Sequence, residues 1–175
     1  MILKLKRTPA IYLVGFMASG KTTVGRLLAG KLGWQFVDLD VDIEAQEQAT
    51  ISEIFERRGE GEFRRAETEA LRKRVRAVQM GTASVLALGG GAFAQEINFN
   101  LVEENGISIW LDCPLETLQA RAAEESHRPL ARDAVRFAAL YQERRPVYAR
   151  ADYRIEEAGK PPEEIVQEVL GLPLF

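Results

Sequence analysis

The sequence predicts an α/β fold with a mostly parallel sheet. Segments typical of strands and of helices alternate along its 175 residues, as in chains built from strand–helix–strand units. Residues 11–14 are apolar throughout, as expected for a central parallel strand that helices cover on both faces. Glycine-rich or acidic residues follow three of the expected strands, and ligands of such sheets bind beyond the carboxyl ends of the strands. We therefore expect a binding site at that edge of the sheet.

The composition indicates one globular domain over residues 1–175. Hydrophobic residues make up 46% of the chain and charged residues 28%, which is typical of a folded protein. A net charge of -3 argues against a general nucleic-acid binder, and no apolar run approaches the length of a membrane span. Cys113 is the single cysteine, so no intrachain disulfide can form and a reducing compartment is the simplest location. We expect a cytoplasmic monomer that binds neither nucleic acid nor membranes.

Five short segments are expected to form the strands. Most are apolar runs, and the third runs directly into three consecutive glycines. The strands are expected at residues 11–14, 35–38, 84–88, 107–111 and 153–155. Because parallel strands point the same way, the residues that follow them are expected to meet at one edge of the sheet.

Helices are expected between these strands, where apolar residues recur at helical spacing. Gly33 and Gly59 are suited to end helices, and Pro114 is suited to begin one. Pro146 predicts a kink or break in another, and the polar segment 126–132 predicts a mobile surface segment. The helices are expected at residues 21–32, 52–58, 62–80, 95–104, 115–125, 135–149 and 162–170. Expected core contacts from the second and third of these are Ile54, Phe55, Phe63, Leu71, Val75 and Val78.

A phosphate-binding loop is expected after the first strand. Gly15, Gly20, Lys21 and Thr22 fit the pattern G-x-x-x-x-G-K-[ST]. In such loops the backbone N–H groups and the helix N-terminus surround the phosphates, the lysine reaches the β- and γ-phosphates, and the hydroxyl binds Mg²⁺. The alternative is a glycine-rich turn before an ordinary helix. The apolar strand before the loop and the periodic helix after it favour the phosphate site.

Two carboxylates, Asp38 and Asp40, end the second strand. If the strand continues through both, alternation points their side chains the same way. One could then hold Mg²⁺ through water, while the other orients or deprotonates a substrate hydroxyl. The alternative is a solvated strand end that caps the next helix, since aspartate favours that position. The pair alone leaves both possibilities open.

Gly89, Gly90 and Gly91 follow the third strand and allow a backbone to approach a ligand closely or to adopt positive φ. A tight turn is the alternative, and the position at a strand end favours a ligand contact. Cys113 is expected to be a packing residue. Arginines suited to bidentate capture of carboxylate or phosphate groups cluster along the chain, although most must be solvated and the sequence does not select among them. They are Arg64, Arg65, Arg121, Arg128, Arg144 and Arg145.

Taken together, these stretches resemble the shikimate kinases, small enzymes similar to the nucleoside-monophosphate kinases. The resemblance covers nearly the whole chain, from Ile11 to about Leu170. Many unrelated NTPases share the phosphate loop, whereas Phe-Arg-x-x-Glu followed at this distance by three glycines is specific to the family. The motifs are Gly15-Phe16-Met17-Ala18-Ser19-Gly20-Lys21-Thr22-Thr23-Val24-Gly25, Asp38-Leu39-Asp40, Gly59-Glu60-x-x-Phe63-Arg64-x-x-Glu67, Gly89-Gly90-Gly91, Arg128-Pro129-Leu130 and Arg144-x-Pro146-x-Tyr148.

The resemblance implies a fold and a reaction. The fold is a three-layer α/β/α P-loop kinase with a five-stranded parallel sheet, in a single domain with its core at residues 10–172. A mobile lid would lie at about 124–134 and a substrate-binding helical region at about 40–70. The reaction transfers the γ-phosphoryl group of ATP to the 3-hydroxyl of shikimate, giving ADP and shikimate 3-phosphate in aromatic amino acid biosynthesis. Mg²⁺ would be the cofactor.

The resemblance also assigns residues to roles. The catalytic residues would be Lys21, Asp40 and Arg128. The residues that bind ATP and its phosphates would be Gly15, Ala18, Ser19, Gly20, Lys21, Thr22, Thr23, Arg121 and Arg128. Those that bind shikimate would be Asp40, Arg64, Gly89, Gly90, Gly91 and Arg144. Mg²⁺ would be held by Thr22 and, through water, by Asp38.

Within these roles, Asp40 would contact the shikimate hydroxyls and act as base, and Arg64 and Arg144 would bind the carboxylate. Arg128 would be the lid arginine that reaches the transferring phosphoryl group, and Arg121 would stack on adenine. Phe63 and Glu67 would shape the acceptor pocket and hold its arginine.

Two positions depart from the family pattern, since Ala18 stands where glycine is usual and Ala131 follows Leu130 where the lid often has a second leucine. The Cβ of Ala18 predicts a negative φ at this residue. Two other functions also remain open. A gluconate kinase would act on another anionic polyol, and a regulatory nucleotide-binding module would have lost catalysis. The Phe63-Arg64 motif with the three glycines favours shikimate, and the intact set of Lys21, Thr22, Asp38, Asp40 and Arg128 argues against the module.

Overall fold

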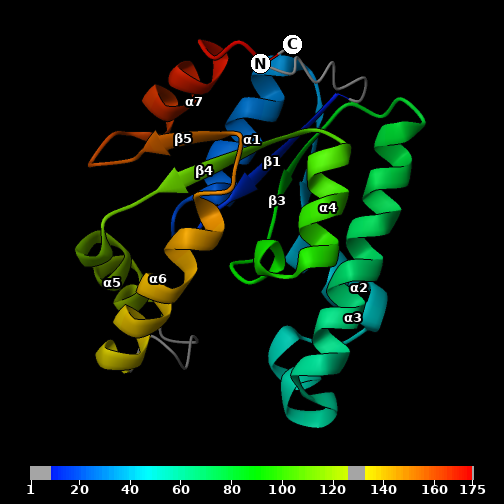
Figure 1. Cartoon of the computed structure of the whole chain (residues 1–175), viewed down its shortest axis with the longest axis vertical. Coiled ribbons are helices and arrows are strands. Elements are labelled where there is room, and N and C mark those ends of the chain that lie inside the picture. The colour runs from blue at the N-terminus through cyan, green and yellow to red at the C-terminus, as the bar shows by residue number, and fades with distance from the viewer. Residues whose placement is uncertain (1–8, 126–132, 175) are drawn as a thin grey trace.

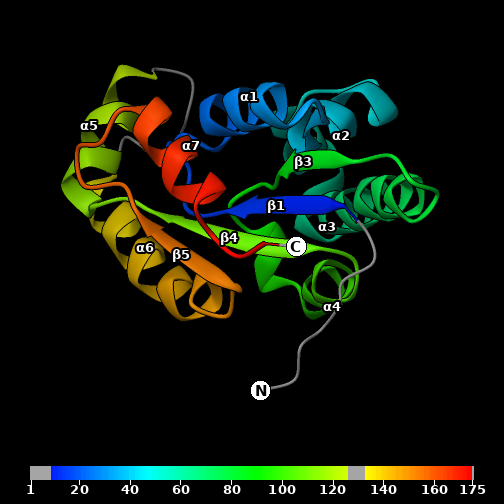
Figure 2. The same cartoon turned by 90° about the horizontal axis from the view of Figure 1, so that it is seen from above.

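The computed structural model describes residues 9–125 and 133–174, which form a parallel sheet between two layers of helices (Figure 1; Figure 2). In chain order the elements are β1 (Ala10–Val14), α1 (Lys21–Leu32), β2 (Gln35–Asp38), α2 (Leu39–Glu47), α3 (Ile51–Gln79), β3 (Ser84–Ala87), the 3-10 turn η1 (Ala92–Ala94), α4 (Glu96–Glu104), β4 (Ile107–Asp112), α5 (Leu115–Glu124), α6 (Ala134–Tyr148), β5 (Tyr153–Glu156) and α7 (Pro162–Leu170). The five strands follow the order β2-β3-β1-β4-β5. The predicted fold class is therefore confirmed.

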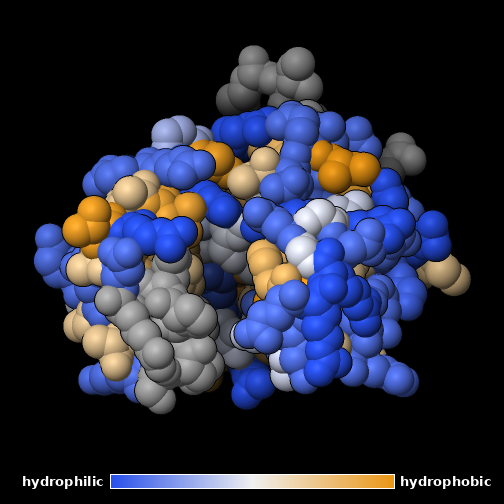
Figure 3. Space-filling view, turned by 90° about the horizontal axis from the view of Figure 1, so that it is seen from below, coloured by the Kyte–Doolittle hydropathy of each residue, from blue (hydrophilic) through white to orange (hydrophobic). Residues whose placement is uncertain are grey.

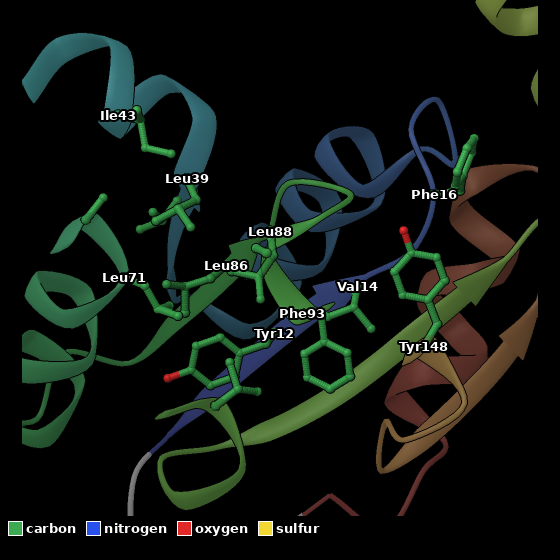
Figure 4. Close-up of a cluster of buried hydrophobic side chains, with 14 of the residues drawn as sticks. Tyr12, Val14, Phe16, Leu39, Ile43, Leu71, Leu86, Leu88, Phe93 and Tyr148 are labelled. Atoms are coloured by element: carbon green, nitrogen blue, oxygen red, sulfur yellow. The ribbon is translucent and has the colours of Figure 1, made fainter. Parts of the chain in front are cut away.

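The central strand β1 is buried along its whole length, and its side chains alternate between the two helical layers. Tyr12 and Val14 belong to the core cluster that includes residues of α3, α4 and α6 (Figure 4). Ile11 and Leu13 belong to a second cluster, with residues of α1 and α7. A strand covered on both faces needs apolar residues at every position, and the unbroken run in the sequence reflects this requirement.

The register of the sheet brings three loops together. Leu13 of β1 pairs with Ala87 of β3, and Asp38 of β2 pairs with the same alanine. The strands β1, β2 and β3 therefore end side by side. The loop after β1, the start of α2 and the glycines after β3 all leave the sheet at this edge.

Each predicted strand is present, with bounds that differ by at most one residue, and α1 and α7 have the predicted bounds. The predicted break at Gly59 is confirmed as a kink inside α3, because φ 83° and ψ 172° at this residue are not helical angles. Phe55 is wrong as a core residue, because it is 39% exposed, whereas the other predicted core contacts of α3 are buried. The predicted mobile segment 126–132, with most of the predicted lid, lies outside the described residues.

Two further differences concern α2 and α6. The local residue pattern did not predict α2, whose buried residues are only Leu39 and Ile43 among many acidic positions. The predicted break at Pro146 is wrong, because α6 continues to Tyr148. Pro146 lies near the C-terminal end of the helix, where residues on either side of it are anchored to other elements. Among the described residues, none of the helices combines the length and the apolar character that crossing a lipid bilayer requires.

Candidate functional site

The loop that joins β1 to α1 turns on two glycines. Gly15 has φ 149°, and a methyl group there would lie 2.8 Å from the carbonyl oxygen of Leu111. Gly20 has φ 83° and is the N-cap of α1. Lys21 Nζ donates to the carbonyl oxygens of Gly15 and Phe16, both at 2.9 Å. The loop thus combines a helix N-terminus with a lysine, which together suit a phosphate group.

Ala18 adopts the left-handed conformation, with φ 63°. The predicted negative φ is therefore wrong. An L-residue with a Cβ loses about 1–2 kcal/mol in this conformation relative to the right-handed one. The carbonyl oxygen of Ala18 accepts a hydrogen bond from Arg121 Nη1 at 3.1 Å, which helps to hold the peptide in place. The strained backbone at Ala18 is therefore held by a hydrogen bond from Arg121.

Asp38 has two roles at the end of β2. Its Oδ2 accepts from the hydroxyl of Thr22 at 3.0 Å, and its Oδ1 accepts from the backbone N–H of Asp40 at 3.0 Å. The second contact makes Asp38 the N-cap of α2, while Asp40 lies in the first helical turn. The expectation that strand alternation orients both carboxylates is therefore wrong. Asp38 can therefore cap the helix and belong to the site at the same time. Its Oδ1 accepts from the helix backbone, and its Oδ2 accepts from Thr22.

The donor set at Thr22 and Asp38 fits Mg²⁺. A hydroxyl and a carboxylate 3.0 Å apart provide hard oxygen atoms beside the phosphate loop. Mg²⁺ commonly uses one or two carboxylates, with phosphate oxygens and water completing the coordination. Within the described ranges, no group of three or more acidic, histidine or cysteine side chains forms a self-contained metal cage. The site therefore suits an ion that arrives with a nucleotide.

Two arginines converge on Gly91 from different helices. A methyl group at Gly91 would overlap the guanidinium groups of Arg64, from α3, and Arg144, from α6. Arg64 Nη1 pairs with Glu67 Oε1 at 2.9 Å, and Arg144 Nη1 donates to the carbonyl oxygen of Gly90 at 2.9 Å. Two cationic forks side by side can bind a carboxylate through several parallel hydrogen bonds.

Two of the three glycines, Gly89 and Gly91, lie close to side chains of the site. A methyl group at Gly89 would lie 2.9 Å from Asp40 Oδ1 and 3.3 Å from Glu67 Oε2, and Gly91 lies under the two arginines. No positive φ occurs at these three positions. The possibility of positive φ is therefore wrong, whereas the tight turn is present, because the N–H of Ala92 donates to the carbonyl oxygen of Gly89 at 3.1 Å. The ligand contact stays a prediction. Gly90 differs from its neighbours, since a methyl group there would make only ordinary contacts.

Glu67 is a buried carboxylate beside Asp40 and the two arginines. Burial raises the pKa of Glu67, and the charge of Asp40 adds to this, although the charges of Arg64 and Arg144 and the hydrogen bond from Arg64 oppose it. Glu67 thus fixes Arg64 at an electrostatic cost to the fold. The Phe-Arg-x-x-Glu motif indicated this pairing.

Two cavities meet at these residues. The larger, of about 450 Å³, is lined by Met17, Ala18, Ser19, Gly20, Lys21, Thr22, Thr23, Asp38, Asp40, Gly89, Gly90, Arg121 and Glu157, among others. The smaller, of about 280 Å³, is lined by Met17, Asp40, Phe63, Arg64, Glu67, Gly89, Gly90, Gly91, Arg144 and Tyr148, among others. Asp40 and Gly90 border both. The face shown in Figure 3 is hollowed near its centre, and mostly hydrophilic residues surround the hollow. The arrangement can bring two polar ligands into contact at Asp40.

The other predicted residues are placed as follows. Arg128 lies outside the described residues. Arg65 pairs with Glu62 on the exposed surface, and Arg145 pairs with Asp112 at 2.8 Å, so neither lines these two cavities. Cys113 is buried, and burial, with the neighbouring Glu157, raises the pKa of its thiol to about 12. This environment agrees with a packing role, because the reactive thiolate is suppressed.

Tyr148 and Glu157 received no role from the sequence. The hydroxyl of Tyr148 donates to the carbonyl oxygen of Gly90 at 2.5 Å, and Glu157 pairs with Arg121 at 2.8 Å. Tyr148 belongs to the motif Arg144-x-Pro146-x-Tyr148, so its spacing carried a signal. Nothing in the sequence pointed to Glu157.

Known proteins resemble this chain over most of its length. The family model for Shikimate kinase matches residues 17–172. A shikimate kinase from Persephonella marina is 44% identical over 162 residues, which is 92% of this chain and 96% of the relative. A shikimate kinase from Acinetobacter baumannii, solved in complex with shikimate, has a TM-score of 0.86 and 38% identity, covering 94% of this chain and 92% of that one. A gluconokinase from Sinorhizobium meliloti is similar in fold alone, with a TM-score of 0.58 and 16% identity over 94% of this chain and 90% of that one.

Proposed function

The chain belongs to the shikimate kinase family, and from this membership we propose that it transfers the γ-phosphoryl group of ATP to the 3-hydroxyl of shikimate. The products would be ADP and shikimate 3-phosphate, an intermediate of aromatic amino acid biosynthesis. The observation that carries the proposal is the pair of adjoining cavities. One contains the phosphate loop, the other contains two convergent arginines, and Asp40 borders both. This is the arrangement that direct transfer between two bound substrates requires.

On the nucleotide side, we assign the phosphates of ATP to the loop after β1. The backbone N–H groups and Lys21 would balance the negative charge of the phosphates. The ε-ammonium of Lys21 is already in the loop, where it donates to the carbonyl oxygens of Gly15 and Phe16. Arg121 lines the same cavity and would form one side of the adenine site. The assignment of Arg128 to the transferring phosphoryl group rests on the Arg128-Pro129-Leu130 motif alone.

On the acceptor side, we assign the shikimate carboxylate to Arg64 and Arg144. Both guanidinium groups lie over Gly91, so two positive charges face one small region. Asp40 would accept the proton of the reacting hydroxyl, since it borders both cavities. The site would thereby select acceptor molecules that carry a hydroxyl and a carboxylate at a fixed separation. Loss of one buried charged partner should cost several kcal/mol of binding free energy.

Mg²⁺ is the proposed cofactor, held by Thr22 and, through water, by Asp38. When bound, it would stabilise negative charge on the phosphate oxygens. The fit rests on the hard oxygen pair described above. The protein's own contribution is to orient these two oxygens, because Asp38 is fixed as the N-cap of α2.

We also propose that residues 1–175 act as one kinase domain with an acceptor-binding region at about 40–70. Because one chain supplies every residue that we assign, the enzyme should work as a monomer. Its cytoplasmic location is proposed from the single cysteine, since a reducing compartment suits a chain without disulfides. Size-exclusion chromatography with light scattering would test the monomeric state. A dimer at working concentration would contradict it.

The decisive experiment measures ADP release with shikimate, with gluconate and without acceptor, for the parent and for Asp40→Asn. We expect turnover that depends on shikimate and falls at least a hundredfold in the variant, because general base catalysis contributes about 10²–10⁴-fold. Asp42→Asn is the matched control, since Asp42 lies in the same helix but binds Arg74 instead. Turnover with gluconate alone would support the gluconate kinase, and no turnover with either acceptor would support a regulatory module.

A further inference from the structure

Glu157 is a buried carboxylate outside every motif of the sequence. It follows β5 directly, and its side chain is only 5% exposed. Its Oε1 pairs with Arg121 Nη2 at 2.8 Å, while its Oε2 is buried without a hydrogen-bond partner in the described part of the chain. A buried carboxylate is costly unless it is paired, so Glu157 binds Arg121 firmly.

Cys113, which neighbours Glu157, offers this carboxylate no counter-charge, because a thiol is neutral and a thiolate would be negative. Burial raises the pKa of Cys113 to about 12, and Glu157 contributes to this rise. The thiol is therefore neutral at working pH. The hydrogen bond that Arg121 donates to Glu157 is the largest cause of the raised pKa of Arg121. The two residues thus form a stable ion pair at the wall of the larger cavity.

Arg121 connects this pair to the phosphate loop. Its Nη2 contacts Glu157, and its Nη1 donates to the carbonyl oxygen of Ala18 at 3.1 Å. A methyl group at Gly20 would lie 3.7 Å from Glu157 Oε1 and 3.9 Å from Arg121 Nη1, so the pair adjoins the loop. The peptide that it reaches is the strained one, because Ala18 has φ 63°.

We propose that Glu157 is a positioning residue for the nucleotide. It holds the guanidinium of Arg121 against the Ala18 carbonyl and so stabilises the strained phosphate loop in the form that receives the phosphates of ATP. This proposal rests on the proposed function only in assigning ATP to the larger cavity. Glu157 acts through Arg121, so its removal should weaken nucleotide binding and leave the acceptor site intact.

Simple charge effects predict the opposite result. Removing a negative charge beside a phosphate site should strengthen the binding of an anionic nucleotide. If Glu157 positions Arg121, its removal should instead weaken binding, because the loop loses a fixed hydrogen bond. The direction of the change therefore separates the two explanations.

The test compares Glu157→Gln with Glu156→Gln. Glu156 is the adjacent carboxylate, it is 66% exposed, and it contacts Arg154 instead of Arg121. We expect Glu157→Gln to raise the KM for ATP about tenfold, the scale of one hydrogen bond to a charged group. The KM for shikimate and both values for Glu156→Gln should stay near those of the parent. Calorimetric titration with ADP should show the same loss, independently of turnover.

Two further variants show whether the effect passes through Arg121 and Ala18. In an Arg121→Ala background, Glu157→Gln should cause no additional loss of ADP affinity. In an Ala18→Gly background its effect should shrink, because glycine adopts the left-handed conformation without strain. An unchanged or tighter ADP affinity in folded Glu157→Gln, an equal rise in both KM values, or undiminished effects in both backgrounds would overturn the proposal. If the parent binds ADP but shows no turnover with shikimate, the proposed function fails while this test remains valid.

Discussion

The hydroxyl of Tyr148 donates a hydrogen bond of 2.5 Å to the carbonyl oxygen of Gly90, which borders both cavities, as Gly89 does. Arg144 donates to the same oxygen at 2.9 Å. The C-terminal turn of α6 is therefore joined to the glycine segment through two side chains. A methyl group at Gly90 would lie 3.6 Å from the backbone nitrogen of Met17, so the segment that these two side chains hold lies beside the phosphate loop.

Tyr148→Phe should raise the KM for shikimate several-fold, because Gly90 loses one of its two donors and Arg144 becomes less fixed. The free energy of unfolding should fall by about 1 kcal/mol, the usual value of one hydrogen bond. Tyr141→Phe is the control, since Tyr141 lies in the same helix but donates to the carbonyl oxygen of Cys113 at 3.1 Å. Steady-state kinetics and urea denaturation measure both effects. Equal KM values in the two variants would contradict the positioning of the glycines by Tyr148.

Arg64→Ala should raise the KM for shikimate at least tenfold more than the KM for ATP, because a charged hydrogen-bond partner of the carboxylate is lost. Its neighbour provides the control. Arg65 is 70% exposed and pairs with Glu62, so Arg65→Ala should leave both values near those of the parent. Equal effects of Arg64→Ala on the two substrates would refute the role that we assign to it.

Gly91→Ala should abolish productive binding of shikimate, whereas Gly90→Ala should be tolerated. The added methyl at Gly91 would displace the guanidinium groups of Arg64 and Arg144, but at Gly90 it would contact the nearest atom at 3.6 Å. Titration with shikimate, followed by calorimetry, measures the difference directly. If the two variants bind shikimate equally well, the arginines are not held over Gly91 as described.

Glu67→Gln should change stability in a manner that depends on pH. Burial raises the pKa of Glu67 in the folded protein, so the folded state binds this proton more tightly than the unfolded state. The parent therefore loses stability as the pH rises from the ordinary carboxyl pKa through the raised one, and the Gln variant does not. The stability of the variant relative to the parent should increase over this interval in urea denaturation at several pH values. Parallel curves would show that burial of the Glu67 charge does not govern stability.

Ala18→Gly should raise the free energy of unfolding by up to about 1 kcal/mol, because the left-handed conformation of residue 18 no longer carries strain. Ala120→Gly, at an exposed position within α5, should lower it by about 1 kcal/mol, the ordinary cost of glycine in a helix. Thermal and urea denaturation give both values. Destabilisation of similar size in both variants would mean that Ala18 is not strained in solution.

The sheet could be predicted from the sequence because most of its strands are short apolar runs with clear ends. In contrast, α2 was missed, since only Leu39 and Ile43 face the core and its acidic residues resemble a solvated turn. A helix across Pro146 was predicted as well, but the break expected at this residue was wrong. Arg145 and Tyr148 bind Asp112 and Gly90 on other elements, and such contacts are not visible in a local pattern.

The site was predictable wherever a motif fixes the geometry locally, as at Lys21 and Thr22. The conformation of Ala18 was not, because the hydrogen bond from Arg121 comes from a residue more than one hundred positions away. The role that we propose for Glu157 also depends on Arg121, with which it pairs. The motifs therefore indicated many of the residues that line the two cavities, while the residues that brace the loop required the assembled fold.

The place of β1 at the centre of the sheet also bears on how a newly made chain acquires its binding site. The phosphate loop leaves the ribosome early, but β1 pairs with β3, which begins at Ser84, and with β4, which begins at Ile107. Pairing between such distant segments is slow and comes late in folding. During most of synthesis, the apolar strand therefore lacks the neighbours that later bury it. Nascent chains should accordingly need protection from aggregation before they can bind a nucleotide.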